Sequence, residues 1–320
     1  MAKLGGLVGE LRAQVKALED DLRARVDGPD TYGRQESVYE LWHTEWEGAL
    51  KAQRTASSWQ EWRDERVTQA AVAWVLLTVF ARFCEDNELV RPAWIAGHTK
   101  ERRQLALDAR RAYFQANGEH NDRHWLSQII QHFAAMGATA GLVDEFSPLH
   151  QVTPSGDAAR RLLEFWWETD PEGEELLRRF RDPNLGTRFL GDLYQDLSEF
   201  AQKKYALLQT PEFVEEFILD QTMEPALAER PLEGFRLIDP TCGSGHFLLG
   251  AFARLLNRWS KRAPNLEPRA LVQKALDGVH GVDINPFAVA IARFRLIVAA
   301  LKATGERSLE KAPDFQLNLA

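Results

Sequence analysis

A glycine-rich loop that follows a carboxylate is the part of the sequence best suited to chemistry. The short apolar run 235–238 leads into Asp-Pro-Thr-Cys-Gly-Ser-Gly at 239–245, and an apolar helical pattern begins at His246. Gly243 and Gly245 let the backbone turn tightly and approach a ligand that a Cβ atom would exclude. The helix N-terminus then offers unpaired N–H groups to a negatively charged group. The sequence therefore predicts a strand, a ligand-binding loop and a helix.

A second carboxylate, Asp283, closes the next expected strand, 278–283. In nucleotide-binding α/β folds, the acid at this place accepts hydrogen bonds from ribose hydroxyls. The dinucleotide fingerprint Gly-x-Gly-x-x-Gly fits poorly, because Leu248 stands where the third glycine belongs. Asp239, at the mouth of the first strand, suits an ammonium group better than a pyrophosphate. Together these residues favour S-adenosyl-L-methionine, with Asp239 facing the methionine amino group and Asp283 the ribose.

The order of the motifs carries a family resemblance. The segment 237–300 resembles motifs I and II of the gamma-type DNA adenine-N6 methyltransferases, and Leu-Gln-Thr-Pro-Glu-Phe-Val at 208–214 resembles their motif X. Motif X upstream of motif I is characteristic of this type. With its tryptophan-rich helical leader, the chain resembles the N-terminal part of the methyltransferases of BREX (phage-growth-limitation) phage-defence systems. The match is specific over 205–305 and looser over 1–200.

The resemblance also implies roles for individual residues. Thr210 would bind the methionine carboxylate, Asp283 the ribose hydroxyls, and Ile284 would pack on the adenine. The methionine and ribose part would be held by Asp239, Pro240, Thr241, Cys242, Gly243, Ser244 and Gly245. One departure from the family pattern is Gln209, since an aromatic residue commonly precedes the Thr-Pro of motif X.

The transfer motif of this family is missing from the sequence. Motif IV, [Asn/Asp/Ser]-Pro-Pro-aromatic, holds the target amino group and stacks on the flipped base. No Pro-Pro pair occurs here, and Asn285-Pro286-Phe287 belongs to the turn after the second strand. We therefore expect a truncated fragment, from a partial reading frame or a split gene, that holds part of the cofactor and cannot methylate DNA alone. No catalytic residue and no metal ligand is assigned. For the whole protein, the resemblance implies double-stranded DNA with a flipped adenine as substrate and allows other phage-defence proteins as partners.

The expected architecture is α/β: an all-helical domain over 1–185, linker helices and motif X over 186–230, and an incomplete Rossmann-like class I methyltransferase core over 231–320. Apolar residues at steps of three and four predict most of the helices. The expected helices are 4–26, 37–55, 59–88, 101–117, 124–136, 158–167, 174–181, 192–204, 213–221, 246–259, 268–276 and 287–302, and a third strand begins near 314–320. Thr210 is expected to cap the helix at 213–221, with Pro211 in its first position.

Composition limits the class of protein. The chain has 320 residues, of which 45% are hydrophobic, enough for a substantial core. Its 39 Lys and Arg against 47 Asp and Glu give a net charge of −8, which excludes bulk positive charge as the basis of DNA affinity. Cys84 and Cys242 lie too far apart for a zinc motif or a disulfide framework, which favours a reducing bacterial cytoplasm. The apolar run 70–81 is too short to span a bilayer, so no membrane is expected as a partner.

Several residues leave alternatives open. Cys242 could be a nucleophile, but in this loop it more often fills a site that needs a small side chain. His246 could be a general base, although its place among apolar residues favours a structural role. The tryptophans of the leader could stack on bases, and packing between helices is their commoner use. Lys203-Lys204 could contact phosphate or solvent equally well. Two other functions remain: a different S-adenosylmethionine enzyme, acting on RNA, protein or a small molecule, and a non-catalytic interaction module.

Overall fold

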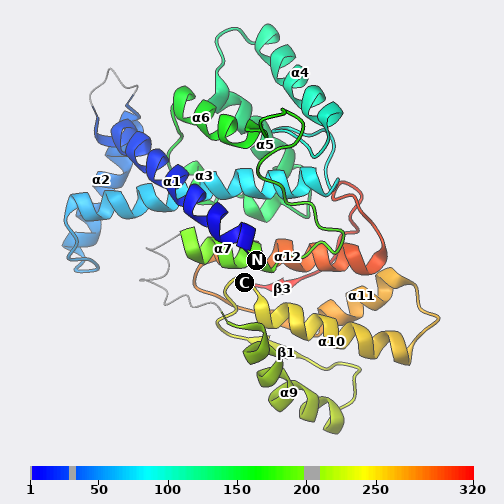
Figure 1. Ribbon diagram of the computed structural model, residues 1–320. Coiled ribbons are helices and arrows are strands. Elements are labelled where there is room, and N and C mark those ends of the chain that lie inside the picture. The colour runs from blue at the N-terminus through cyan, green and yellow to red at the C-terminus, as the bar shows by residue number, and fades with distance from the viewer. Residues whose placement is uncertain (1, 29–33, 198–209) are drawn as a thin grey trace.

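The computed structural model describes residues 2–28, 34–197 and 210–320 and has an α/β architecture that is mostly helical (Figure 1). Eleven helices and a small sheet of three parallel strands occur within these ranges. The helices of the first half gather on one side of the molecule, and the sheet with its helices lies on the other. Leu208, Gln209 and the pair Lys203-Lys204 lie outside the described residues.

The helical half is built around α3, Trp59–Asp86, which is buried almost continuously from Ala70 onward. Helix α1 (Ala2–Asp27) crosses α3 and packs its apolar stripe against it (Figure 1). The other helices of this half are α2 (Glu36–Lys51), α4 (Lys100–Ala116), α5 (Asp122–Ala134) and α6 (Gly156–Trp167). Trp42, Trp74, Trp125 and Trp166 are each at most 2% exposed, so these four tryptophans pack in the core.

Helix α3 is also the one helix in the described part of the chain that is long and apolar enough to cross a membrane. Of its most apolar 18-residue window, 89% is buried inside the protein. Burial of this kind is what the core helix of a globular fold requires, because an apolar helix without a polar face must be covered on all sides.

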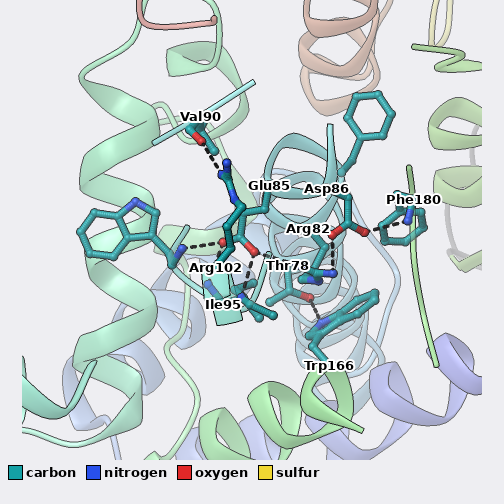
Figure 2. Close-up of polar contacts among 12 residues, drawn as sticks. Thr78, Arg82, Glu85, Asp86, Val90, Ile95, Arg102, Trp166 and Phe180 are labelled. Atoms are coloured by element: carbon teal, nitrogen blue, oxygen red, sulfur yellow. Dashed lines mark hydrogen bonds and ion pairs between the residues drawn. The ribbon is translucent and has the colours of Figure 1, made fainter. Parts of the chain in front are cut away.

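A buried polar cluster ends α3 (Figure 2). Arg82 donates hydrogen bonds to Glu85, at 2.9 Å, and to Asp86, at 2.6 Å, and all three residues are at most 1% exposed. Glu85 also accepts the backbone N–H groups of residues 94, 95 and 96, and Asp86 accepts that of Phe180. The cluster therefore fixes two loops, 94–96 and 180, against the end of the core helix.

One helix expected from the sequence, 174–181, is wrong. Instead, the chain folds back at 170–175, with backbone hydrogen bonds from Asp170 N–H to the Glu175 carbonyl and from Leu177 N–H to the Glu168 carbonyl. Further on, the N–H of Phe180 donates to Asp86, and its carbonyl accepts a hydrogen bond from Asn87. Hydrogen bonds to distant residues thus use the groups that a helix would need. The short 3₁₀ helices Ala140–Leu142 and Pro148–His150 were not expected either.

The sheet half follows the expected order of elements. Helix α9 (Glu212–Glu229) precedes β1 (Leu237–Asp239), α10 (His246–Arg262) and α11 (Pro268–Asp277), and then come β2 (Val279–Gly281), α12 (Pro286–Thr304) and β3 (Asn318–Leu319). The strand order is β1-β2-β3, all parallel, with Asp239 paired to Gly281 and Gly281 to Leu319. Parallel strands require such helical crossovers, and their carboxyl ends meet at one edge of the sheet.

Helix α12 belongs to both halves. Its residues Phe287, Ile291 and Phe294 join the core of the helical half, and Ala292 and Leu296 join the core beneath the sheet. Figure 1 shows α12 and α7 (Arg188–Leu197) between the helical half and the sheet with α10. This explains why α12 lacks a polar face: it is covered from two sides.

Candidate cofactor-binding site

The glycine loop between β1 and α10 adopts the tight turn expected from its sequence. Gly243 has φ +51° and Gly245 has φ +85°, both in the left-handed region that favours glycine. A Cβ on Gly245 would lie 2.9 Å from the Cβ of Ala292, so this glycine also lets the loop pack on α12. A Cβ on Gly243 would meet nothing within 4 Å, which leaves open space on that side of the loop.

The two strand-end carboxylates lie at the same edge of the sheet and frame the loop. Asp283 accepts hydrogen bonds from the N–H groups of Gly243 and Asn285, each at 2.8 Å. Asp239 accepts one from the N–H of Thr241, at 3.1 Å. Burial raises the pKa of Asp239, the Thr241 hydrogen bond opposes that rise, and the negative charge of Asp283 adds to it. A cationic group next to Asp239 would offset both the burial and the repulsion from Asp283, so this pair of carboxylates fits an ammonium or sulfonium ligand.

The other candidate residues divide into exposed and buried ones. Pro240 and Thr241 are exposed on the loop, and Ile284, directly after Asp283, is 84% exposed. Ser244, in contrast, is 2% exposed, and its oxygens face Arg295 on α12. The side chain of Ser244 is therefore turned away from the open side of the loop.

Thr210 lies before α9, where motif X was expected, but its predicted capping role is wrong. Pro211 occupies the N-cap position and α9 begins at Glu212, so the helix starts without a side-chain cap. The carbonyl of Thr210 instead accepts a hydrogen bond from the guanidinium of Arg188. This contact from α7 holds the backbone of Thr210 one residue before the N-cap.

Cys242 and His246 have the surroundings of structural residues. Cys242 is 5% exposed, and burial, together with Asp239 and Asp283, raises the pKa of its thiol to about 12. A Cβ on Gly281 would lie 3.1 Å from the sulfur, so a small side chain is needed here. His246 is 6% exposed, and its Nε2 lies 3.3 Å from Oδ1 of Asp192. Neither group has the exposure that a nucleophile or a general base for an outside substrate requires.

Sequence reasoning missed the residues behind the loop. Arg295 is 1% exposed on α12, and its Nη1 donates to the Ser244 carbonyl at 2.6 Å. Gly191 on α7 faces the same point, because its Cβ would lie 2.4 Å from the Ser244 hydroxyl. The available signals were a charged residue within the most apolar helix and a glycine within an amphipathic one.

Two cavities lie elsewhere in the molecule. One, of about 490 Å³, lies between the end of α3 and the loop after α12, and the other, of about 530 Å³, between the end of α5 and the same loop. None of the candidate cofactor residues lines either of them. The candidate site is instead defined by the loop and the two carboxylates at the edge of the sheet.

Comparison with known proteins first shows what this region is similar to. Residues 220–316 match the family model of the DNA-methyltransferase domain of MmeI. This range contains β1, the glycine loop, α10, β2, Asp283 and α12. Thr210 and α7 lie upstream of it. A methyltransferase domain implies a methyl donor as its cofactor.

A particular relative extends the similarity to the helical half. The chain is 50% identical to the adenine-specific methyltransferase PglX of Streptomyces coelicolor, with 97% of this chain and 26% of PglX covered. It is also 24% identical to the putative type II restriction enzyme and methyltransferase RM.MjaORFECS2P of Methanocaldococcus jannaschii, with 42% of this chain and 16% of that protein covered. The chain thus spans about a quarter of the length of PglX. The methyltransferase resemblance predicted from motifs X, I and II is confirmed, including over the tryptophan-rich leader.

Proposed function

We propose that this chain is the methyl-donor-binding part of a site-specific DNA methyltransferase that modifies adenine at N6. Similarity to PglX over nearly the whole chain supports the class of reaction. The single observation that carries the proposal is the glycine loop framed by Asp239 and Asp283, two carboxylates that suit a cationic ligand. The donor we propose is S-adenosyl-L-methionine, whose sulfonium supplies the activated methyl group.

The fold we infer is a Rossmann-like class I methyltransferase core preceded by a helical domain. Support comes from three parallel strands in the order β1-β2-β3, joined by helices, with the loop at their carboxyl edge. Ligands of open α/β sheets bind outside the carboxyl ends of the strands. We also propose that the boundaries between the helical domain, the linker region and the methyltransferase core lie at residues 185 and 230.

Each candidate residue has a proposed task. The carboxylate of Asp239 holds the ammonium of the methionine part, and Asp283 accepts from the ribose hydroxyls while keeping the loop closed through Gly243. Thr210 binds the methionine carboxylate, and Ile284 offers its exposed side chain to the adenine ring. The remaining loop residues, Pro240, Thr241, Cys242, Gly243, Ser244 and Gly245, shape the backbone that approaches the methionine and ribose.

The transfer step needs groups that this sequence does not supply. Positioning of the methyl group and the target amine in line provides most of the rate enhancement in such a displacement, and no metal is required. Because no Pro-Pro motif is present, no residue of this chain is assigned to hold the flipped adenine. We propose that the chain binds the donor and does not methylate DNA alone. For the whole protein, we propose double-stranded DNA as substrate, a role in phage defence with other defence proteins, and a cytoplasmic setting.

Isothermal titration calorimetry with S-adenosylmethionine tests this function. The wild-type chain should bind, Asp283→Ala should lose the signal, and Asp283→Asn, which keeps one acceptor, should bind weakly. A suitable control is Glu229→Ala, with the same change in charge at an exposed residue at the far end of α9 from Thr210. No binding by the folded wild-type chain would refute the proposal and favour a non-catalytic interaction module.

A further inference from the structure

Helix α7, Arg188–Leu197, lies upstream of the region that matches the methyltransferase family model, yet it contacts three segments of the candidate cofactor site. Arg188, Gly191 and Asp192 are three and four residues apart, which places them along one side of the helix. The buried residues Leu190, Leu193, Tyr194 and Leu197 join the core of the helical half. The helix therefore connects that core to the site.

The first contact is with the glycine loop. Gly191 approaches so closely that a Cβ would lie 2.4 Å from the Ser244 hydroxyl and 2.6 Å from Nη1 of Arg295. Arg295 in turn donates to the Ser244 carbonyl at 2.6 Å, so the loop is held from behind by α7 and α12 together. Next to Gly191, Asp192 lies 3.3 Å from Nε2 of His246, the first residue of α10.

Charges around this contact are balanced. Burial lowers the pKa of Arg295 to about 10, while Asp192 and Glu215 raise it and Arg188 lowers it. Arg295 therefore stays protonated at neutral pH. Two cations and two anions from α7, α9 and α12 thus compensate each other, and the buried pair among them, Arg295 and Glu215, is the one for which an unpaired charge would be costly.

The second contact is with motif X. Arg188 donates to the Thr210 carbonyl and also to Glu215 on α9, the latter at 2.9 Å. Glu215 is 7% exposed and lies against α10, since a Cβ on Gly250 would be 2.4 Å from its Oε1. Arg188 therefore fixes Thr210 relative to the helix that follows the glycine loop.

The third contact is with the segment after β2. Asn285 donates from Nδ2 to the Tyr194 hydroxyl at 2.5 Å, and its N–H donates to Asp283. The Tyr194 ring also packs edge-on against Phe287, with 5.3 Å between ring centroids. Tyr194 thus holds the turn in which Asp283 and Ile284 stand.

We propose that α7 positions the methyl-donor site, with Arg188, Gly191 and Tyr194 as positioning residues that orient motif X, the glycine loop and the Asp283 turn. This inference rests on the proposed donor-binding function and adds a control element outside the matched domain. Because Leu190, Leu193 and Leu197 anchor α7 in the helical core, the helix gives all three segments a common support. Such a support is stiff, because buried side chains packed at native density cannot move independently.

Two variants test the proposal in the 320-residue chain. Gly191→Ala should separate α7 from the loop, and Tyr194→Phe removes only the hydroxyl that Asn285 contacts. We expect Gly191→Ala to weaken S-adenosylmethionine binding at least tenfold in calorimetry, and Tyr194→Phe to weaken it severalfold. The control, Leu163→Ala, removes a fully buried side chain of α6 from the helical core and should lower the melting temperature without changing affinity.

A second measurement needs no ligand. Hydrogen–deuterium exchange of the cofactor-free protein should rise in peptides 239–247 for Gly191→Ala, and only in peptides 283–288 for Tyr194→Phe. Unchanged exchange and affinity in both variants, or equal effects of Leu163→Ala, would overturn the role of α7. If the wild-type chain binds no donor but the exchange pattern is as expected, the donor-binding function fails while the positioning by α7 stands.

Discussion

Replacing Glu85 with alanine should cost the helical half about 3–5 kcal/mol in unfolding free energy, the range measured when one partner of a buried ion pair is removed. The side chain is fully buried and accepts four hydrogen bonds: three from the backbone N–H groups of residues 94–96 and one from Arg82 (Figure 2). Each buried donor left without an acceptor costs about 1–3 kcal/mol. Summed over three N–H groups and a buried guanidinium, the cost would exceed about 3–5 kcal/mol, but water that enters the loop satisfies some of these donors and lowers the cost.

Urea unfolding followed by tryptophan fluorescence measures this cost. Trp94, in the loop that Glu85 holds, packs against Trp125 with 5.2 Å between ring centroids, so release of the loop should also shift the emission. Glu85→Gln should fall between alanine and wild type, because its amide oxygen accepts while its amide nitrogen faces other donors. For control, Glu88→Gln removes an exposed charge from the same region and should change stability by less than about 1 kcal/mol. A loss below about 1 kcal/mol for Glu85→Ala would refute the reasoning.

Four further outcomes concern the site, the buried cysteines and the edge of the sheet. Asp239→Asn should raise the melting temperature of the cofactor-free chain, because a carboxylate whose pKa is raised by burial destabilises the folded state as it ionises, and it should weaken donor binding in calorimetry. Because its raised pKa lets Asp239 take up a proton above the ordinary Asp value of 3.8, the affinity of the wild type for the donor should fall as the pH decreases. An affinity that stays unchanged down to pH 4 would contradict the assignment. The thiols of Cys242 and the fully buried Cys84 should react with a disulfide reagent at pH 8 only in urea; fast labelling of the native chain would contradict their burial. Ile238→Lys should reduce concentration-dependent self-association in sedimentation, since Ile238 is 63% exposed on a strand that pairs on one side only within the described residues; unchanged association would exclude this edge as its cause.

Local signals predicted most of the elements of the sheet half. The alternation of short apolar runs, glycines and helical stripes indicated β1, α10, β2 and α12 within a few residues of their bounds, because these patterns depend on near neighbours. The same held for α1, α3 and α6. Where helix ends differed, as at Lys51 instead of residue 55, the missing residues belong to a turn that the apolar spacing does not register.

Long-range contacts account for what the sequence did not reveal. The segment 174–181 has a helical composition, but Phe180 is bound through its backbone to Asp86 and Asn87, more than ninety positions away. Thr210 precedes a proline and looks like a cap, yet Arg188 holds its carbonyl. In the sequence, Arg295 is only a charged residue within an apolar helix, whereas in the structure it donates a hydrogen bond to the carbonyl of Ser244. Each of these depends on a partner that spacing along the chain cannot identify.

The boundary of the proposed methyltransferase core is not the boundary of the hydrophobic core. Phe294 of α12 packs edge-on against Phe80 of α3, with 5.2 Å between ring centroids, and Phe180 stacks on Phe189 of α7 at 5.4 Å. A chain that began at residue 231 would expose the apolar side of α12. A chain that ended at residue 230 would leave α3 uncovered where α12 packs against it. Burial of a phenylalanine is worth roughly 1.5–3 kcal/mol, so several such contacts make the two halves depend on each other for stability. The helical half therefore contributes to the stability of the sheet half through packing across α12 and α7.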